Sequence, residues 1–197
     1  MLITTIIAAY QDIKLTREAI ESIYDQDLSE FEVLVCSDGD DDKMRESIEN
    51  LNDYRIKYHF VDYQGQYGYR SKNEMTKIAS GNIIIYLDQD NIIYRNCFKR
   101  ILEEWEDDLG VLIFRIKHQV GIIPKANKIE HGSIDTLNGA FRTSVARQCE
   151  MKLEAPSADS LFFKQAEKIC SKDGYRIKYI TDILFYSRLC CKFSLPV

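Results

Sequence analysis

Apolar and polar positions form alternating blocks along the first half of the chain. Four short apolar runs, each typical of a buried β-strand, are separated by segments in which apolar residues recur at helical spacing. Buried strands that alternate with helices predict parallel βαβ units with helices on both faces of the sheet. The predicted strands are "LITTIIAA", "FEVLVCS", "RIKYHFV" and "NIIIYL", at residues 2–9, 31–37, 55–61 and 82–87.

The segments between these strands carry helix signals. The first helix is expected to follow Asp12, whose carboxylate is placed to cap its start, and to run to Tyr24. A second helix is predicted over residues 43–51 and a third over residues 70–80, ended by Gly81.

The pattern loosens in the second half. Apolar positions from Phe98 to Leu109 predict one further helical stripe, and residues 159–173 predict a long helix that ends before a glycine. The remaining apolar runs predict strands: "GVLIFRIK" and "QVGIIP" as a hairpin outside the parallel set, then "YRIKYI" and "ILFYSR" as two closing strands.

Length and composition limit the class of protein. A chain of 197 residues fits one domain, in which residues 1–91 look like a nucleotide-type fold and residues 92–197 like an appendage that finishes the site. Hydrophobic residues make up 45% and charged residues 29%, which is typical of a folded globular protein. The net charge of -5 argues against nucleic acid as the main partner, because phosphate backbones require a basic face.

Targeting and redox signals are weak. No apolar run approaches the ~20 residues of a membrane-spanning helix, so no transmembrane segment is expected. The six cysteines form no CxxC pair or zinc-binding spacing, and we expect a reducing, cytoplasmic location.

The candidate chemistry lies where the predicted strands end. Tyr10 follows the first strand, Asp38 the second, and Asp88 and Asp90 the fourth. Ligands of open parallel α/β sheets bind beyond the carboxyl ends of the strands. Asp88 and Asp90 are two positions apart, so on an extended strand they face the same side, where their repulsion calls for a cation such as Mg²⁺ or Mn²⁺. An isolated turn could also carry these aspartates, but the companion loops favour a site.

Two stretches resemble family 2 glycosyltransferases of the GT-A fold. They are "TTIIAAYQDIKLTREAIESIYDQDLSEFEVLVCSDGDDD" and "GYRSKNEMTKIASGNIIIYLDQDN". The resemblance implies a mixed, mostly parallel sheet with helices on both faces, and an inverting, metal-dependent transfer from a UDP- or GDP-sugar to a glycan or other hydroxyl acceptor. It implies no oligomeric state.

The resemblance also implies roles for individual residues. Tyr10 is expected beside the nucleobase, Asp38 bonded to it, Asp88 at the ribose or metal, and Asp90 on a Mn²⁺ or Mg²⁺ ion. The nucleotide pocket is further expected to include Asp12, Tyr69, Arg70 and Asn73. Apart from the resemblance, Tyr63, Tyr67 and Tyr69 cluster in the loop before the third helix, where their rings could stack on a base or sugar ring or be partly buried at the base of the loop. Arg142 or Arg188 could supply a second cation to the diphosphate, although arginines are also common on protein surfaces. The sequence departs from the family's usual residues at Ala8-Ala9, Gln11, Lys72 and Ala158.

An inverting transfer needs a carboxylate that takes the proton of the acceptor hydroxyl. The resemblance implies Asp159 for this role, although an aspartate at a helix start is also an ordinary cap. The alternatives are a non-catalytic module that binds a nucleotide-sugar or glycan and, with less support, a phosphotransferase whose DxD motif follows a buried strand. Such phosphotransferases usually carry Thr two residues beyond the second Asp of the motif, where this chain has Ile92.

Overall fold

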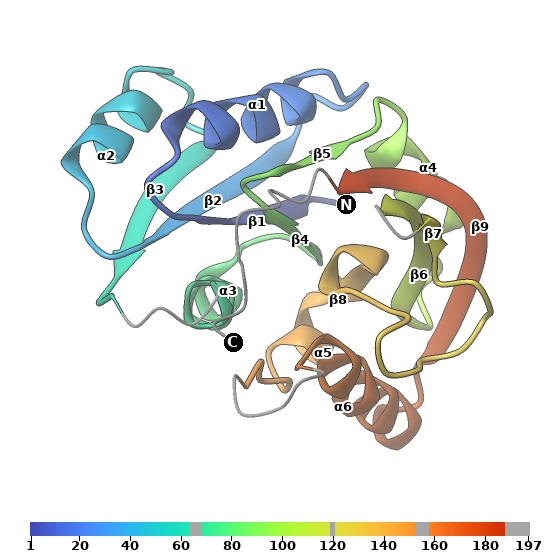
Figure 1. Ribbon diagram of the computed structural model, residues 1–197. Coiled ribbons are helices and arrows are strands. Elements are labelled where there is room, and N and C mark those ends of the chain that lie inside the picture. The colour runs from blue at the N-terminus through green and yellow to red at the C-terminus, as the bar shows by residue number, and fades with distance from the viewer. Residues whose placement is uncertain (64–67, 119–120, 153–157, 188–197) are drawn as a thin grey trace.

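A single sheet runs through both halves of the computed structural model, which describes residues 1–63, 68–118, 121–152 and 158–187 (Figure 1). Its strands are β1 (Ile3–Ala9), β2 (Phe31–Asp38), β3 (Ile56–Val61), β4 (Ile83–Asp88), β5 (Asn91–Ile93), β6 (Leu109–His118), β7 (Gly121–Ile123), β8 (Gly139–Arg142) and β9 (Arg176–Ser187). They are arranged in the order β3-β2-β1-β4-β8-β6-β9-β5, and β7 pairs with β6.

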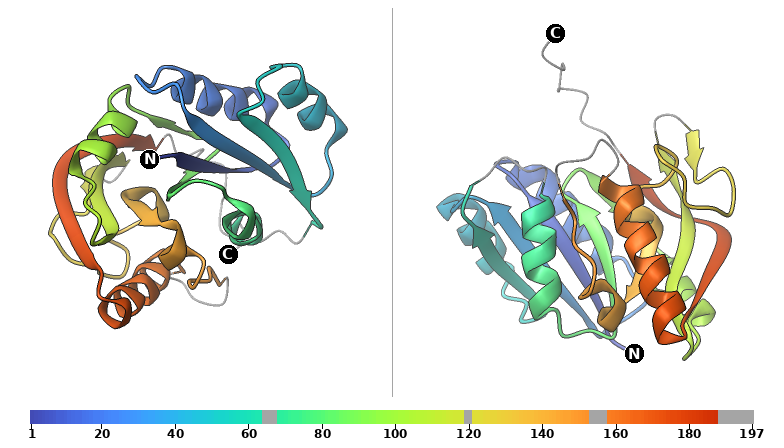
Figure 2. Two further views of the ribbon diagram at one scale, coloured as in Figure 1. Left: turned by 180° about the vertical axis from the view of Figure 1, so that it is seen from behind. Right: turned by 90° about the horizontal axis from the view of Figure 1, so that it is seen from below.

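The helices pack on both sides of this sheet. They are α1 (Ile13–Tyr24), α2 (Asp42–Glu49), α3 (Tyr69–Ile78), α4 (Cys97–Glu104), α5 (Thr143–Ala146) and α6 (Ala158–Asp173), with a 3₁₀ turn η1 (Thr136–Asn138). Helices α1, α2 and α4 share one buried cluster with the sheet, and α3, α5 and α6 share the other. Figure 2 shows α3 and α6 covering the same face.

The first half confirms the predicted βαβ pattern. Strands β1 to β4 are parallel, with β1 between β2 and β4 and β3 at the edge. The side chains of β1, β2 and β4 are almost all buried, because helices cover both faces of the sheet there, whereas the edge strand β3 is partly exposed.

The second half differs from the prediction in three places. The hairpin of β6 and β7 was expected outside the parallel set, but β6 lies in the central sheet between β8 and β9. The two closing strands are one continuous strand, β9, whose pairing with β6 shifts register at several points. The helical stripe ends at Glu104, because Trp105 is extended and Leu109 already begins β6.

Local capping agrees with the sequence. The Asp12 carboxylate accepts a hydrogen bond from the backbone N–H of Leu15 at 2.9 Å, and Asp41 accepts one from Met44 at 3.0 Å. These bonds satisfy N–H groups that have no partner within the helix.

Gly68 fixes the start of α3. Its φ of +74° lies in the left-handed region, and a Cβ at this position would lie 2.6 Å from the Cβ of Ala8. Since only glycine allows this approach, the first turn of α3 packs directly against the carboxyl end of β1.

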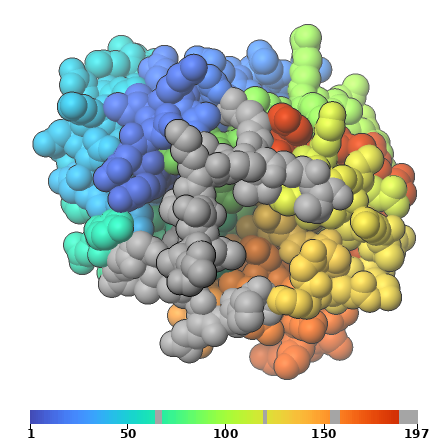
Figure 3. Space-filling view, viewed as in Figure 1, coloured from blue at the N-terminus to red at the C-terminus, as the bar shows by residue number. Residues whose placement is uncertain are grey.

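Within the described residues, no helix combines the length and apolarity needed to cross a bilayer. Figure 3 shows the first strands with their helices, in blue to teal, and the segments around β8 and α6, in yellow to orange, on opposite sides of one face.

Candidate active site

The carboxyl ends of β1, β2 and β4 lie at one edge of the sheet. Ala8 pairs with Asp88 of β4, and Ala9 pairs with Ser37 of β2. The predicted meeting of these strand ends is therefore confirmed. Tyr10 follows β1, and Asp38 and Asp88 are the last residues of their strands.

The arrangement of Asp88 and Asp90 differs from the prediction that both lie on an extended strand. Strand β4 ends at Asp88, and Gln89 and Asp90 form a turn, so the alternation of an extended strand does not relate the two aspartates. A cation is also already present: the Lys72 ammonium of α3 lies 2.7 Å from Asp88 Oδ1. Only 2% of the Lys72 side chain is exposed, against 32% of that of Asp88.

Gln89 joins the acidic turn to the end of β1. Its Oε1 accepts the backbone N–H of Tyr10 at 2.7 Å, and its Nε2 donates to the Tyr10 carbonyl at 3.0 Å. The Thr16 hydroxyl donates to the same Oε1 at 3.2 Å. The residue between the two aspartates thus fixes the backbone on which Tyr10 is carried.

Two further carboxylates approach Lys72 from the second half of the chain. Asp159 lies in the first turn of α6, and its Oδ1 accepts a hydrogen bond from the Thr136 N–H at 3.4 Å. Asp135 precedes η1 and accepts the Leu137 N–H at 3.0 Å. Both segments therefore point carboxylates at the carboxyl edge of β4.

The charges in this group perturb one another. Burial by itself lowers the pKa of the Lys72 ammonium. The surrounding carboxylates outweigh burial and raise its pKa above the ordinary value; in order of strength they are those of Asp88, Asp159 and Asp135. The ammonium therefore stays charged throughout the physiological pH range.

The pKa values of two of these carboxylates are raised as well. Burial, reinforced by the charges of Asp159 and Asp88, raises the pKa of Asp135 to about 7. Burial also raises the pKa of Asp159, while Lys72 opposes this effect and Asp88 adds to it. Because three carboxylates share one ammonium, the group has a residual affinity for a proton.

Tyr69 belongs to this charged group. Burial raises the pKa of its hydroxyl to about 12, and the charge of Asp159 adds to the effect. The Lys72 ammonium lies 5.9 Å from the centre of its ring. Tyr69 was predicted among the nucleotide-binding residues. In the structure it lies near Asp159, the residue predicted as the general base.

A pocket of about 550 Å³ lies beside the group, at the ends of β1 and β2, and its lining includes Tyr10, Asp38 and Tyr63. Three other acidic residues of its lining are held by α2. Asp40 and Asp42 pair with the Arg45 guanidinium, and Asp41 caps the helix.

Other predicted residues have structural partners. The Asp12 carboxylate caps α1. The Arg70 guanidinium lies 3.9 Å from the Asp62 carboxylate. The Asn73 side chain donates to the Met151 carbonyl at 2.9 Å and accepts its N–H at 3.0 Å, so its amide connects α3 to the segment before α6.

The suggestion of a diphosphate contact from Arg142 is wrong. Its guanidinium donates to the carbonyl of Leu109 at 2.7 Å and lies 4.7 Å from the centre of the Tyr175 ring. Arg142 pairs with Ile83 at the start of β4. It therefore lies at the other end of this strand from Asp88. Arg188 and Tyr67 lie outside the described residues.

A hollow of about 720 Å³, larger than the pocket at the strand ends, lies elsewhere in the molecule. It lies along α3 and residues 147–152, where Arg147 donates to the Ala79 carbonyl at 2.7 Å. The polar groups of Asn73 and Arg147 in its lining hold segments of the protein together. We therefore place the candidate active site at the carboxyl edge, where the shared charges lie.

Sequence reasoning missed Lys72, Asp135 and Gln89. Lys72 was noted only where the family usually has Arg, and Gln89 only as the residue between two aspartates. Asp135 precedes Asn138-Gly139, a stretch that indicates a turn and gives no sign of a half-buried carboxylate beside Lys72.

Solved structures define the class of fold. The S. aureus TarS 1-349 structure aligns with a TM-score of 0.75 at 20% identity, covering 95% of this chain and 60% of that one. Mannosyltransferase PcManGT from Pyrobaculum calidifontis, in complex with GDP-Man and Mn²⁺, aligns with a TM-score of 0.71 at 16% identity, covering 96% and 57%. The mostly parallel sheet with acidic strand ends is thus a GT-A fold, as predicted.

Residues 4–178 match the model of Glycosyl transferase family 2, and the chain belongs to that family. An uncharacterized glycosyltransferase of Nostoc sp. is 30% identical over 133 residues, which cover 65% of this chain and 39% of the relative. The GalNAc(5)-diNAcBac-PP-undecaprenol beta-1,3-glucosyltransferase of Campylobacter jejuni is 27% identical over 104 residues, covering 52% and 34%.

A third relative is the UDP-Glc:alpha-D-GlcNAc-diphosphoundecaprenol beta-1,3-glucosyltransferase WfgD of Escherichia coli. It is 33% identical over 96 residues, covering 48% of this chain and 37% of the relative. The matched segments thus span less than two fifths of each of these three relatives.

Proposed function

We propose that this domain transfers a hexose from a UDP- or GDP-sugar to a hydroxyl of a glycan or related acceptor, with inversion at the anomeric carbon. The observation that carries the proposal is the charged group around Lys72, because it joins Asp88 at the donor end of the sheet to Asp159 on α6. Donor and acceptor would meet between these two carboxylates.

Asp159 is the proposed general base. Its carboxylate receives the proton of the acceptor hydroxyl while that oxygen attacks the anomeric carbon from the face opposite the nucleoside diphosphate. Burial raises the pKa of Asp159, which makes it a better proton acceptor than an exposed aspartate, while Lys72 favours its ionised form. The Thr136 N–H bond fixes one carboxylate oxygen, which positions the base.

Asp88 and Asp90 are the proposed ligands of a Mn²⁺ or Mg²⁺ ion. Hard divalent ions take oxygen ligands, and Mg²⁺ commonly binds one or two carboxylates with phosphate and water as its remaining ligands. The half-buried Asp90 and the Asp88 oxygen not bonded to Lys72 fit this requirement. When bound, the ion would neutralise charge on the diphosphate leaving group.

The relatives support the substrate class. The names of the C. jejuni and E. coli relatives describe glucosyl transfer to sugars linked to diphosphoundecaprenol, and PcManGT was solved with GDP-Man and Mn²⁺. Tyr10 and Asp38, in the pocket beside the charged group, are the proposed contacts of the donor's nucleobase.

The test is Asp159→Asn with Glu167→Gln as its matched control, since Glu167 is an exposed acid on the same helix. We expect the first substitution to lower turnover with UDP- or GDP-hexose by roughly 10²- to 10⁴-fold and to leave the Kd of the nucleoside diphosphate nearly unchanged. Glu167→Gln should match the parent in both measurements. Equal turnover in Asp159→Asn would remove this residue from the mechanism, and nucleotide binding without turnover in the parent would support the non-catalytic module.

A further inference from the structure

Tyr63 is an exposed aromatic residue beside the proposed nucleobase pocket. It follows β3, and its ring stacks on that of Tyr10 with a centroid distance of 5.8 Å and an interplanar angle of 21°. Both side chains line the 550 Å³ pocket, yet 62% of Tyr63 and 41% of Tyr10 remain exposed. Two adjacent tyrosines with this much exposed ring surface form an apolar wall in a pocket otherwise lined by acidic and polar groups.

The backbone holds Tyr63 next to Asp38. Gly39 N donates to the Val61 carbonyl at 2.8 Å, which ties the loop after β2 to the end of β3. Gly39 has a φ of +98°. A Cβ built on Gly39 would lie 3.5 Å from the Cβ of Tyr63, so the two residues are in close proximity. The position of Tyr63 is thus set by the same strand ends that carry Asp38.

We propose that Tyr63 is a second nucleobase-contacting residue, and that the uracil or guanine of the donor stacks on a wall made by Tyr63 and Tyr10. This inference rests on the proposed function, because it concerns the donor of that reaction. Because the two rings already contact each other, with 5.8 Å between their centroids, the base contacts the ring surface that both tyrosines leave exposed.

The expected size of the effect follows from base stacking on aromatic side chains. Removal of such a ring typically weakens binding by roughly 5- to 150-fold, whichever base is bound. The effect requires a base, so it should not extend to the diphosphate part of the ligand. This requirement separates a nucleobase contact from a general loosening of the loop.

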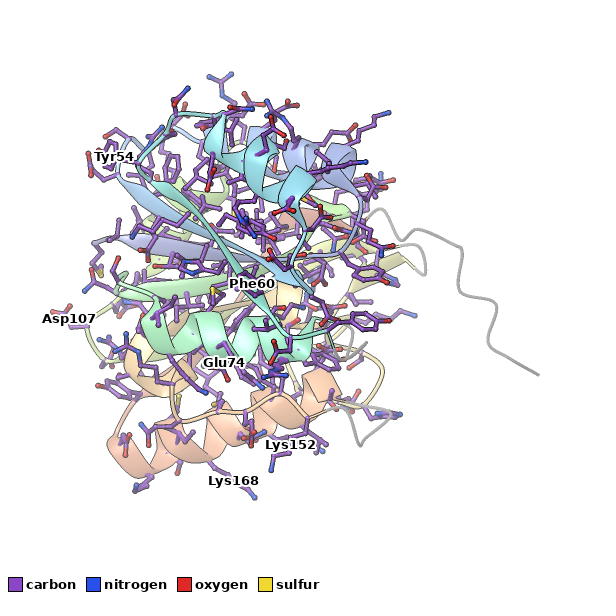
Figure 4. All side chains as sticks on the ribbon, turned by 90° about the vertical axis from the view of Figure 1, so that its left-hand side faces the viewer. Tyr54, Phe60, Glu74, Asp107, Lys152 and Lys168 are labelled. Carbon is purple, nitrogen blue, oxygen red and sulfur yellow. The ribbon has the colours of Figure 1, made fainter. Side chains whose placement is uncertain are left out.

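The experiment measures the Kd of UDP, GDP and inorganic pyrophosphate by calorimetry in the presence of Mn²⁺. The variants are Tyr63→Ala, Tyr63→Phe, which keeps the ring, and Tyr54→Ala as a control. Tyr54 is 81% exposed and lies before β3, at the other end of that strand from Phe60 (Figure 4). Thermal unfolding of each variant verifies that it is folded.

We expect Tyr63→Ala to weaken the better-bound nucleotide by roughly 5- to 150-fold and to leave pyrophosphate binding unchanged. Tyr63→Phe and Tyr54→Ala should stay within about twofold of the parent, because stacking needs only the ring. The inference is overturned if Tyr63→Ala binds the nucleotide as the parent does, or if it loses pyrophosphate affinity by the same factor. If the parent binds neither nucleotide, the proposed function fails together with the role of Tyr63.

Discussion

Replacement of Lys72 by methionine tests whether this side chain is the internal counter-ion of the candidate site. Methionine is unbranched and of similar length, so the change removes the charge and largely preserves the volume. Lys72 lies on α3 with 2% of its side chain exposed, and the carboxylates of Asp88, Asp159 and Asp135 surround it. Lys72→Met would leave them without this ammonium.

The magnitude follows from the geometry. At an effective dielectric constant of about 20, unit charges separated by the 2.7 Å between Lys72 Nζ and Asp88 Oδ1 attract by roughly 6 kcal/mol. Desolvation of both groups offsets part of this attraction, and removal of one partner from a buried pair typically costs about 3–5 kcal/mol. We expect the free energy of unfolding to fall by that amount at pH 8, and by less at pH 5, where protonation of the carboxylates relieves their repulsion.

Urea denaturation at the two pH values provides the measurement. Lys77→Met is the matched control, because Lys77 lies on the same helix in an exposed pair with Glu74, and it should change the unfolding free energy by less than about 1 kcal/mol. The double variant Lys72→Met with Asp88→Asn should recover part of the loss, because it removes the unpaired charge. A Lys72→Met protein as stable as the parent at pH 8 would refute the counter-ion role.

Three further substitutions test individual features of the site. Burial raises the pKa of Asp135 to about 7, so the folded state holds a proton that the unfolded chain releases near pH 4. The free energy of unfolding therefore falls as the pH rises between these two values. In Asp135→Asn, the fall in unfolding free energy from pH 5 to pH 8 should be smaller than in the parent by roughly 1–3 kcal/mol. Gln89→Ala removes two hydrogen bonds to the backbone of Tyr10, and we expect a loss of about 1–3 kcal/mol in stability together with a higher Kd for the nucleoside diphosphate. Gly68→Ala should lower the unfolding free energy by more than about 1 kcal/mol, because its φ is positive and the new Cβ meets that of Ala8.

Each of these substitutions has a control within the chain. Asp107→Asn, at an exposed position, should leave the pH dependence as it is in the parent. Gln165 makes the same double hydrogen bond to the backbone of Glu150, so Gln165→Ala should destabilise without weakening nucleotide binding. Gly132 also has a positive φ but no atom within 4 Å of an added Cβ, so Gly132→Ala isolates the cost of φ alone. Three results would contradict these arguments: the same pH dependence of stability in the two aspartate variants, the same loss of nucleotide affinity in the two glutamine variants, or the same loss of stability in the two glycine variants.

The sequence by itself determined the parallel half of the fold and the edge at which the candidate site is placed. Four buried apolar runs separated by amphipathic segments allow few arrangements other than parallel βαβ units, and parallel strands place their carboxyl ends at one edge. The positions of Tyr10, Asp38 and Asp88 at that edge therefore followed from local pattern. The extension of the sheet by β8, β6 and β9 did not, because an apolar run that marks a strand carries no information about the partners of that strand.

The tertiary structure alone decided the charge balance of the site. Lys72 sits in a polar helical stretch that would suit an exposed face, and it is buried because Gly68 lets α3 pack against β1. Asp135 and Asp159 are distant from Asp88 along the chain and reach the same edge only through the packing of η1 and α6. Burial and the sum of neighbouring charges set whether a carboxylate is ionised, and both quantities depend on contacts between segments that sequence periodicity does not encode.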